Sequence, residues 1–154
     1  VRRMVVLFDE CYQEMKVYVS RALQVWSQPD DGSLAVVRDA VSELTGGIEP
    51  VPRVMVEYLV QQDDSESVPL VHELWLKDAS EWEALYGDMG EAIEDGILEG
   101  LPDYGPLQLV SAARLLGRVG TAKSLPALEE AKTGASAELR VTLEQAIRSI
   151  ENRQ

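Results

Sequence analysis

Apolar residues recur every three or four positions along most of the chain, which is the spacing of one buried face on an α-helix. Glycine, proline and short polar stretches interrupt this pattern and divide the chain into helix-length segments. The pattern predicts helices over eight segments: 4–26, 33–45, 52–62, 68–77, 80–100, 107–119, 122–133 and 136–152. The chain is therefore predicted to be all-α.

Two of these segments carry further signals. Segment 52–62 contains three alternating valines, which would also suit a β-strand, so the helical interpretation competes there with a strand. Ser80 and Glu83 have the spacing of a capping box, in which each side chain accepts from a backbone N–H at the start of a helix. This predicts one helix that begins near Ser80 and continues to Gly100.

The last third of the chain contains an internal repeat. Segments 107–119 and 136–152 align at an offset of 31 residues. Their apolar positions then coincide in three pairs: Ala112 with Leu143, Leu116 with Ile147 and Val119 with Ile150. A turn at Gly120 and a short helix with an early proline lie between them. The order is long helix, short helix, long helix.

These residues resemble the HEAT family, in particular its short repeats of the phycobilisome-lyase type. The resemblance rests on Ala-Ala-Arg-Leu-Leu-Gly-Arg-Val-Gly at 112–120, on Ser-Leu-Pro-Ala-Leu at 124–128, and on Leu139-Arg140 leading into Ala146-Ile147. It covers residues 107–152. Leu143 stands where the family usually has a small residue, and the pattern is lost from Arg148 onward, as in a terminal cap.

The resemblance implies an α-α superhelix, that is, a HEAT-like solenoid, of about seven to eight helices. One helix pair cannot bury its apolar face alone, and about three units normally stack. We therefore expect residues 1–100 to form a divergent helical region, either degenerate repeats or a cap, packed with 107–152 as one domain. The sharpest break lies at 101–106 and is a candidate joint between the two parts.

The balance of charge restricts the partners. The chain has 154 residues, with 14 lysines and arginines against 27 aspartates and glutamates, for a net charge of −13. Such a surface repels phosphate backbones and anionic headgroups and attracts basic proteins. We expect no direct nucleic-acid binding and no membrane span, since the apolar run at the N-terminus ends after five residues. A cytoplasmic location is the expectation.

Few residues could carry chemistry. Cys11 is the only cysteine and His72 the only histidine, so a disulfide framework or a cysteine-based zinc site within one chain is excluded. We interpret Cys11 as a packing residue and His72 as a surface or hydrogen-bonded core residue; a nucleophilic pair of the two is the less favoured alternative. Phosphate-binding, dinucleotide-binding and hydrolase motifs do not occur in the sequence. No catalytic residues, no metal ligands and no cofactor are predicted.

The acidic residues are concentrated in the middle of the chain. Residues 73–103 contain ten acidic residues and one basic residue, Lys77. The ordinary interpretation is a solvated helix face; the alternatives are a docking surface for a basic partner and, less favoured, a carboxylate metal cluster. The candidate partner-binding residues are Trp82, Tyr86, Asp88, Glu91, Asp95 and Glu99, and the four carboxylates are expected at helical spacing on one side of the predicted helix. The two aromatic residues are expected in the core, or as interface anchors if they are exposed.

Taken together, the sequence predicts a non-enzymatic protein–protein interaction module or scaffold with an acidic helical surface. The chain begins with Val1, which suggests that it is part of a larger protein. One alternative is an acidic inhibitor or immunity-type protein that blocks a basic partner. A less favoured alternative, implied by the resemblance alone, is a bilin-lyase-like enzyme.

Overall fold

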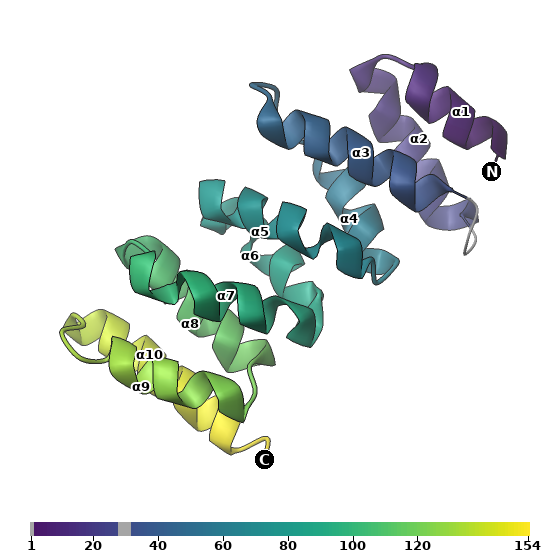
Figure 1. Cartoon of the computed structure of the whole chain (residues 1–154). Helices are drawn as coiled ribbons and strands as arrows, with labels where there is room; N and C mark the ends of the chain where they lie inside the picture. The colour runs from purple at the N-terminus through teal and green to yellow at the C-terminus, as the bar shows by residue number, and fades with distance from the viewer. Residues whose placement is uncertain (1, 28–31) are drawn as a thin grey trace. The chain divides into compact units, whose positions relative to one another are not determined.

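The computed structural model describes residues 2–27 and 32–154, apart from the side chains of residues 9 and 13. Every regular element in these ranges is helical (Figure 1), which confirms the all-α prediction for them. The α-helices are α1 (Arg2–Glu10), α2 (Gln13–Trp26), α3 (Ser33–Gly46), α4 (Arg53–Gln61), α5 (Val68–Lys77), α6 (Ala79–Asp88), α7 (Glu94–Gly100), α8 (Pro106–Val119), α9 (Leu125–Ala131) and α10 (Ala137–Glu151). Four short 3-10 helices accompany them: η1 (Ser65–Ser67), η2 (Gly90–Ile93), η3 (Leu101–Asp103) and η4 (Ala122–Ser124).

The described ranges thus hold ten α-helices, so the predicted number of about seven to eight is wrong. The difference comes from two predicted helices that are each broken in two. Segment 4–26 is divided between α1 and α2 at Tyr12, whose backbone is extended (φ −64°, ψ 154°). Segment 80–100 is divided between α6 and α7 by η2, where Gly90 has a positive φ of 68°.

Other predictions of local structure had mixed outcomes. Segment 52–62 forms a helix, α4, and not the strand that its valines would also allow. The predicted capping box of Ser80 and Glu83 is wrong, because Asp78 caps α6 by accepting from the backbone N–H of Glu81 at 3.1 Å. Hydrogen bonds from the Ser80 hydroxyl and from that backbone N–H hold the pKa of Asp78 below its ordinary value.

The chain divides into two compact units, residues 1–73 and 74–154. The division lies within α5, between Glu73 and Leu74. Segment 101–106, the break expected from the sequence, lies inside the second unit, where Leu101 is buried.

In the first unit, α1 packs against α2 and α3, and α4 packs against α2 and α3. Helices α1 and α3 therefore form one layer and α2 and α4 another (Figure 1). Its core contains Phe8, Leu23, Val37, Val41, Met55, Tyr58 and Leu59, all nearly or fully buried. The buried hydroxyls of Ser33 and Tyr58 share a hydrogen bond of 2.5 Å between α3 and α4.

Arg38 forms an ion-pair network in the same unit. The Arg38 guanidinium on α3 donates two hydrogen bonds to the Asp64 carboxylate, at 2.7 and 2.9 Å, and also contacts Glu66. Asp64 is itself buried, so the pair is of the bidentate kind that contributes geometric specificity as well as energy. It joins α3 to the segment that leads into α5.

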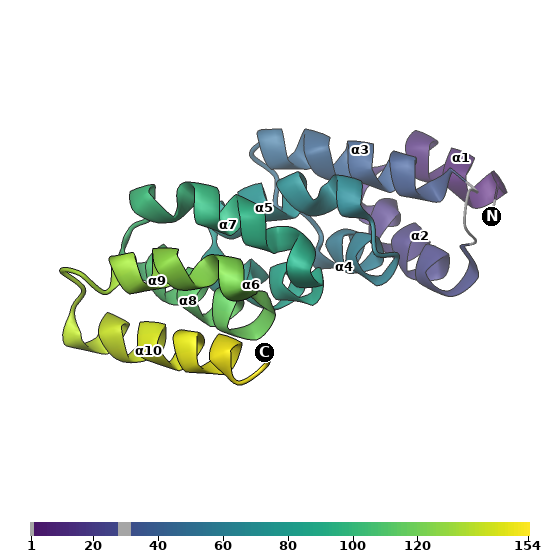
Figure 2. The ribbon, with the colours of Figure 1, turned by 60° about the horizontal axis from the view of Figure 1, so that its bottom comes forward.

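In the second unit, α8 packs between α6 and α10, while α7 packs against α8 and α9 packs against α10. The result is one layer of α6, α8 and α10 with the shorter α7 and α9 against it (Figure 2). Helices α8 and α10 approach closely at Gly117, where an added Cβ would lie 3.0 Å from the Cα of Ala146. No described helix is both long enough and apolar enough to cross a membrane.

Candidate protein-binding surface

The acidic residues of segment 73–103 have three different environments in the second unit. Some pair with basic residues of the helices that follow, one is buried, and some remain in solvent. Because α6 and α7 are separate helices, Asp88 does not share a face with Glu91, Asp95 and Glu99, as one continuous helix would require.

The first group joins α6 to α8. Glu83 pairs with Arg114 at 2.9 Å, and Asp88 pairs with Arg118 at 2.8 Å. Arg118 also donates to the backbone carbonyl of Ala84. Arg114 and Arg118 therefore compensate part of the acidic segment. Both pairs are largely exposed, so each is worth about 0–1 kcal/mol.

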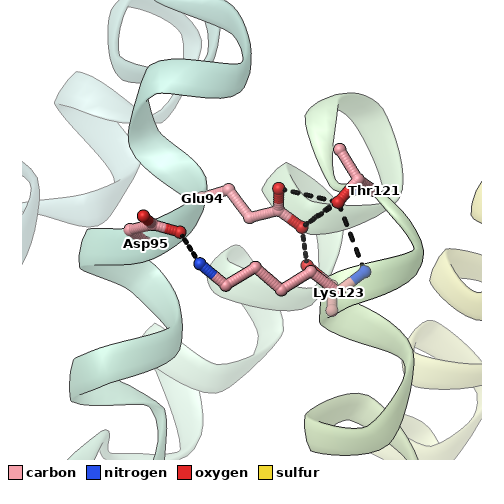
Figure 3. Close-up of polar contacts among 5 residues, drawn as sticks. Glu94, Asp95, Thr121 and Lys123 are labelled. Atoms are coloured by element: carbon pink, nitrogen blue, oxygen red, sulfur yellow. Dashed lines mark hydrogen bonds and ion pairs between the residues drawn. The ribbon is translucent and has the colours of Figure 1, made fainter.

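Glu94, the first residue of α7, forms the buried contact (Figure 3). It is 5% exposed and accepts from the backbone N–H of Thr121 at 2.8 Å and from the Ser124 hydroxyl at 2.5 Å. The Thr121 hydroxyl lies 3.0–3.1 Å from its two oxygens. These donors lie at the start of η4 and α9, so Glu94 caps the start of the next helical segment. Glu94 is not among the candidate residues predicted from the sequence.

Asp95, next in the chain, reaches toward the same η4 turn but stays at the surface. Figure 3 shows the amine of Lys123 reaching from η4 to the Asp95 carboxylate. The Asp95 side chain nonetheless remains 78% exposed. Adjacent carboxylates of α7 thus have opposite roles, one internal and one at the surface.

The third group remains in solvent. Glu91, Glu99 and Asp103 are exposed, and among the described contacts none of them forms an ion pair. Together with Asp95 they follow at four-residue intervals along η2, α7 and η3. We name Glu91, Asp95, Glu99 and Asp103 the α7 acidic surface.

The two aromatic candidates are in the core. Trp82 is 7% exposed and Tyr86 is fully buried, so neither is available as an anchor for a partner in this conformation. Tyr86 stacks on Trp75 with ring centroids 5.4 Å apart, and the Trp75 indole donates to the Ser111 hydroxyl at 2.8 Å. Burial raises the pKa of Tyr86. These residues hold α5, α6 and α8 together.

Tyr104 completes this aromatic cluster. Its ring lies edge-on to Trp75 with centroids 5.3 Å apart, and it packs over Gly100, where a Cβ would lie 2.5 Å from the ring. Burial, with a contribution from the charge of Glu99, raises the pKa of Tyr104 to about 12. The phenol therefore stays protonated and uncharged throughout the physiological range.

A groove runs between the start of α6 and the start of α8. It has a volume of about 440 Å³, and its walls include Leu76, Ser80, Glu83, Leu107 and Arg114. Leu107 is 85% exposed at its edge, and the pair of Glu83 with Arg114 lies along it. The groove thus combines an exposed apolar side chain with both signs of charge.

The residues considered for chemistry do not form a metal site. Cys11 is half-buried, and its thiol donates to the backbone carbonyl of Phe8 at 3.5 Å. Throughout the described ranges, no three histidine, cysteine, aspartate or glutamate side chains are grouped so that they could hold a metal ion. Comparisons with protein-family models, curated proteins and solved structures found no match to this chain.

Proposed function

We propose that this protein is an interaction module that binds a basic protein partner through the α7 acidic surface. The observation that carries the proposal is the separation of the carboxylates: Glu83, Asp88 and Glu94 are bound by other residues of the second unit, whereas Glu91, Glu99 and Asp103 are left in solvent. A net charge of −13 would steer a basic partner towards the chain.

We further propose that the helices form a HEAT-like array. The support is a recurring pair of buried positions four residues apart, found where four helical segments begin: Ser33 and Val37, Ser67 and Val71, Ile93 and Ile97, Ser124 and Leu128. The last two pairs are offset by the 31 residues of the repeat seen in the sequence. An array of this kind presents one rigid helical surface after another to partners.

The experiment compares three forms of the chain as bait against a lysate. In the test variant Glu91, Glu99 and Asp103 are replaced by lysine. In the control variant Glu43, Glu130 and Glu151 are replaced by lysine; these residues are also exposed, and the change in net charge is the same. The proposal expects one set of proteins to be retained at low salt by the wild type and the control, and lost from the test variant.

Retention should also fall as salt is raised, because exposed charges are screened over about 10 Å at 0.1 M salt. Equal capture by the test variant and the wild type would refute the α7 acidic surface as the binding site. A single partner bound tightly at one-to-one stoichiometry would favour the inhibitor alternative over a scaffold. Binding of a tetrapyrrole such as biliverdin would instead favour the lyase-like alternative.

The groove between α6 and α8 supports a second mode, in which a partner inserts an apolar side chain beside Leu107. Replacing Leu107 by glutamate would abolish that mode and leave the salt-sensitive one unchanged. Capture that is insensitive to salt and lost in Leu107→Glu would therefore assign binding to the groove.

A further inference from the structure

Helix α2 carries two apolar faces. Val19 and Leu23 lie on the first face, are 6% and 1% exposed, and belong to the core of the first unit. The second face consists of Met15, Tyr18, Ala22, Val25 and Trp26, at the i, i+3, i+7, i+10 and i+11 spacing of one helix stripe. We name these five residues the α2 outer face.

Four of the five residues of the α2 outer face are exposed, and the small residue between them, Ala22, is half-buried. Tyr18 is 64%, Val25 73% and Trp26 62% exposed, and Tyr12 at the start of the helix is 89% exposed. Isolated exposed apolar residues are ordinary, but a continuous stripe of large ones is characteristic of a surface that another molecule covers. In α10, by contrast, the exposed residues are mostly polar, such as Arg140, Gln145 and Arg148.

Charge indicates which molecule can approach this face. Residues 1–27 contain four basic and three acidic residues, whereas the remaining residues contain ten basic and 24 acidic ones. Two copies of the chain therefore repel each other over most of their surface but not at the N-terminal helices. A second copy of this acidic protein meets the least like-charge repulsion there.

The shape of the face is complementary to itself. Tyr18, Ala22 and Trp26 form a row of residues four apart, in which a small side chain lies between two large ones. Rows of this kind interdigitate when two helices pack ridge into groove. In an antiparallel pair with a two-fold axis at Ala22, Tyr18 of each copy packs against Trp26 of the other, and the small residue allows the helices to approach.

The exposed apolar area of the α2 outer face is of the order that one side of a dimer interface contains. The exposed parts of Tyr18 and Trp26 alone amount to roughly 200–300 Å² per copy, since a whole aromatic side chain buries about 150–250 Å². Met15 and Val25 of the same face, and Tyr12 at the start of α2, add to this. A standard interface needs about 800 Å² per partner. We propose that the α2 outer face is the interface of a symmetric homodimer with its two-fold axis at Ala22.

The first test measures mass in solution by light scattering and sedimentation equilibrium. The proposal expects twice the 17.0 kDa chain mass at micromolar concentrations, with dissociation on dilution. A chain that stays monomeric at every concentration would overturn the proposal and would leave the face to a different partner. Open-ended growth to larger species would overturn it as well, because a symmetric interface closes at two copies.

Two paired variants locate the interface. Replacing Tyr18 and Val25 together by glutamate should raise the dissociation constant at least about 100-fold, because each charge would be buried without a counter-ion. Replacing Ile48 and Val141 by glutamate changes the net charge equally at exposed apolar positions outside the face and should leave the dimer intact. Circular dichroism checks that both variants fold. A dimer that survives the first pair would contradict the assignment.

A crosslink tests the symmetry. In a Cys11→Ala background, Ala22→Cys should give a disulfide-linked dimer on oxidation with diamide, since only a residue near the two-fold axis lies within about 7 Å of its own copy. Val141→Cys in the same background is the control and should remain uncrosslinked. Equal crosslinking of the two variants, or none at Ala22→Cys in a protein of dimeric mass, would rule out an axis at Ala22.

Discussion

Glu94 shows how much of the second unit depends on a single side chain. Its carboxylate accepts from one backbone N–H and two hydroxyls at the start of the η4–α9 turn, and it is almost completely buried. Replacing it by alanine would leave those donors without a partner and would open a cavity. We expect Glu94→Ala to lower the free energy of unfolding by about 2–4 kcal/mol, measured by urea denaturation.

Glu94→Gln separates the effect of the lost side-chain volume from the effect of the lost hydrogen-bond acceptors. Glutamine keeps the length of the side chain and one accepting oxygen, so about half of the loss should be recovered. Glu91→Ala is the matched control, because Glu91 is exposed and should change stability by no more than about 0.5 kcal/mol. Equal effects of Glu91→Ala and Glu94→Ala would contradict a capping role for Glu94.

Gly120 is constrained by its own backbone. A Cβ at this position would lie 2.5 Å from the carbonyl oxygen of Leu116, which accepts the hydrogen bond that ends α8. Because that oxygen cannot move without breaking the end of the helix, Gly120→Ala should cost about 1–3 kcal/mol in a thermal or urea melt. Gly46→Ala has open space around the added Cβ and serves as the control. A neutral Gly120→Ala would show that the turn relaxes freely.

At the scale of the element, one substitution tests the break between α6 and α7. Its effect on stability has opposite directions for a broken and for a continuous helix. Gly90 has φ 68°, in the left-handed region, where any side chain is strained by about 1–2 kcal/mol. Gly90→Ala should therefore destabilise the protein. If segment 80–100 were one continuous helix, the same change would stabilise it by about 1 kcal/mol, because alanine favours helix over glycine. A melting curve of this one variant distinguishes the two structures.

Sequence periodicity located the helices better than it located their ends. Segments 33–45, 68–77 and 107–119 each correspond to one helix of the structure. The apolar spacing around Tyr12 and around Gly90 continues across both breaks, because both helices of each pair contribute to the same core. Spacing along the chain cannot distinguish a continuous apolar face from two faces that meet after a turn.

The undetected break between α6 and α7 also affected the prediction of the partner-binding surface. Placing Asp88 with Glu91, Asp95 and Glu99 required a continuous helix, and the break places Asp88 beside Arg118 instead. The burial of Trp82 and Tyr86 followed the ordinary expectation for aromatic residues on an apolar stripe. The role of Glu94 could not be read from composition, since its donors lie 27 and 30 residues further along the chain.

At the scale of the whole molecule, the excess of carboxylates opposes folding. A net charge of −13 brings like charges together in the compact state, and salt screens that repulsion. Salt also weakens the exposed pairs, such as Glu83 with Arg114, but each of those contributes only about 0–1 kcal/mol. The repulsion should therefore dominate, and the midpoint of thermal unfolding should rise by several degrees between low salt and about 0.5 M sodium chloride.

The lysine variant of the α7 acidic surface tests whether like-charge repulsion causes this salt dependence. Replacing Glu91, Glu99 and Asp103 by lysine raises the net charge by six, from −13 to −7, without removing a described ion pair. The salt-dependent rise in midpoint should shrink markedly in this variant, and its midpoint at low salt should exceed that of the wild type. The variant with lysine at Glu43, Glu130 and Glu151 has the same net charge. If repulsion over the whole molecule governs stability, the two variants respond alike to salt. If repulsion among the carboxylates of the α7 acidic surface governs it, only the first variant is stabilised. A basic partner bound to that surface would then relieve the same repulsion.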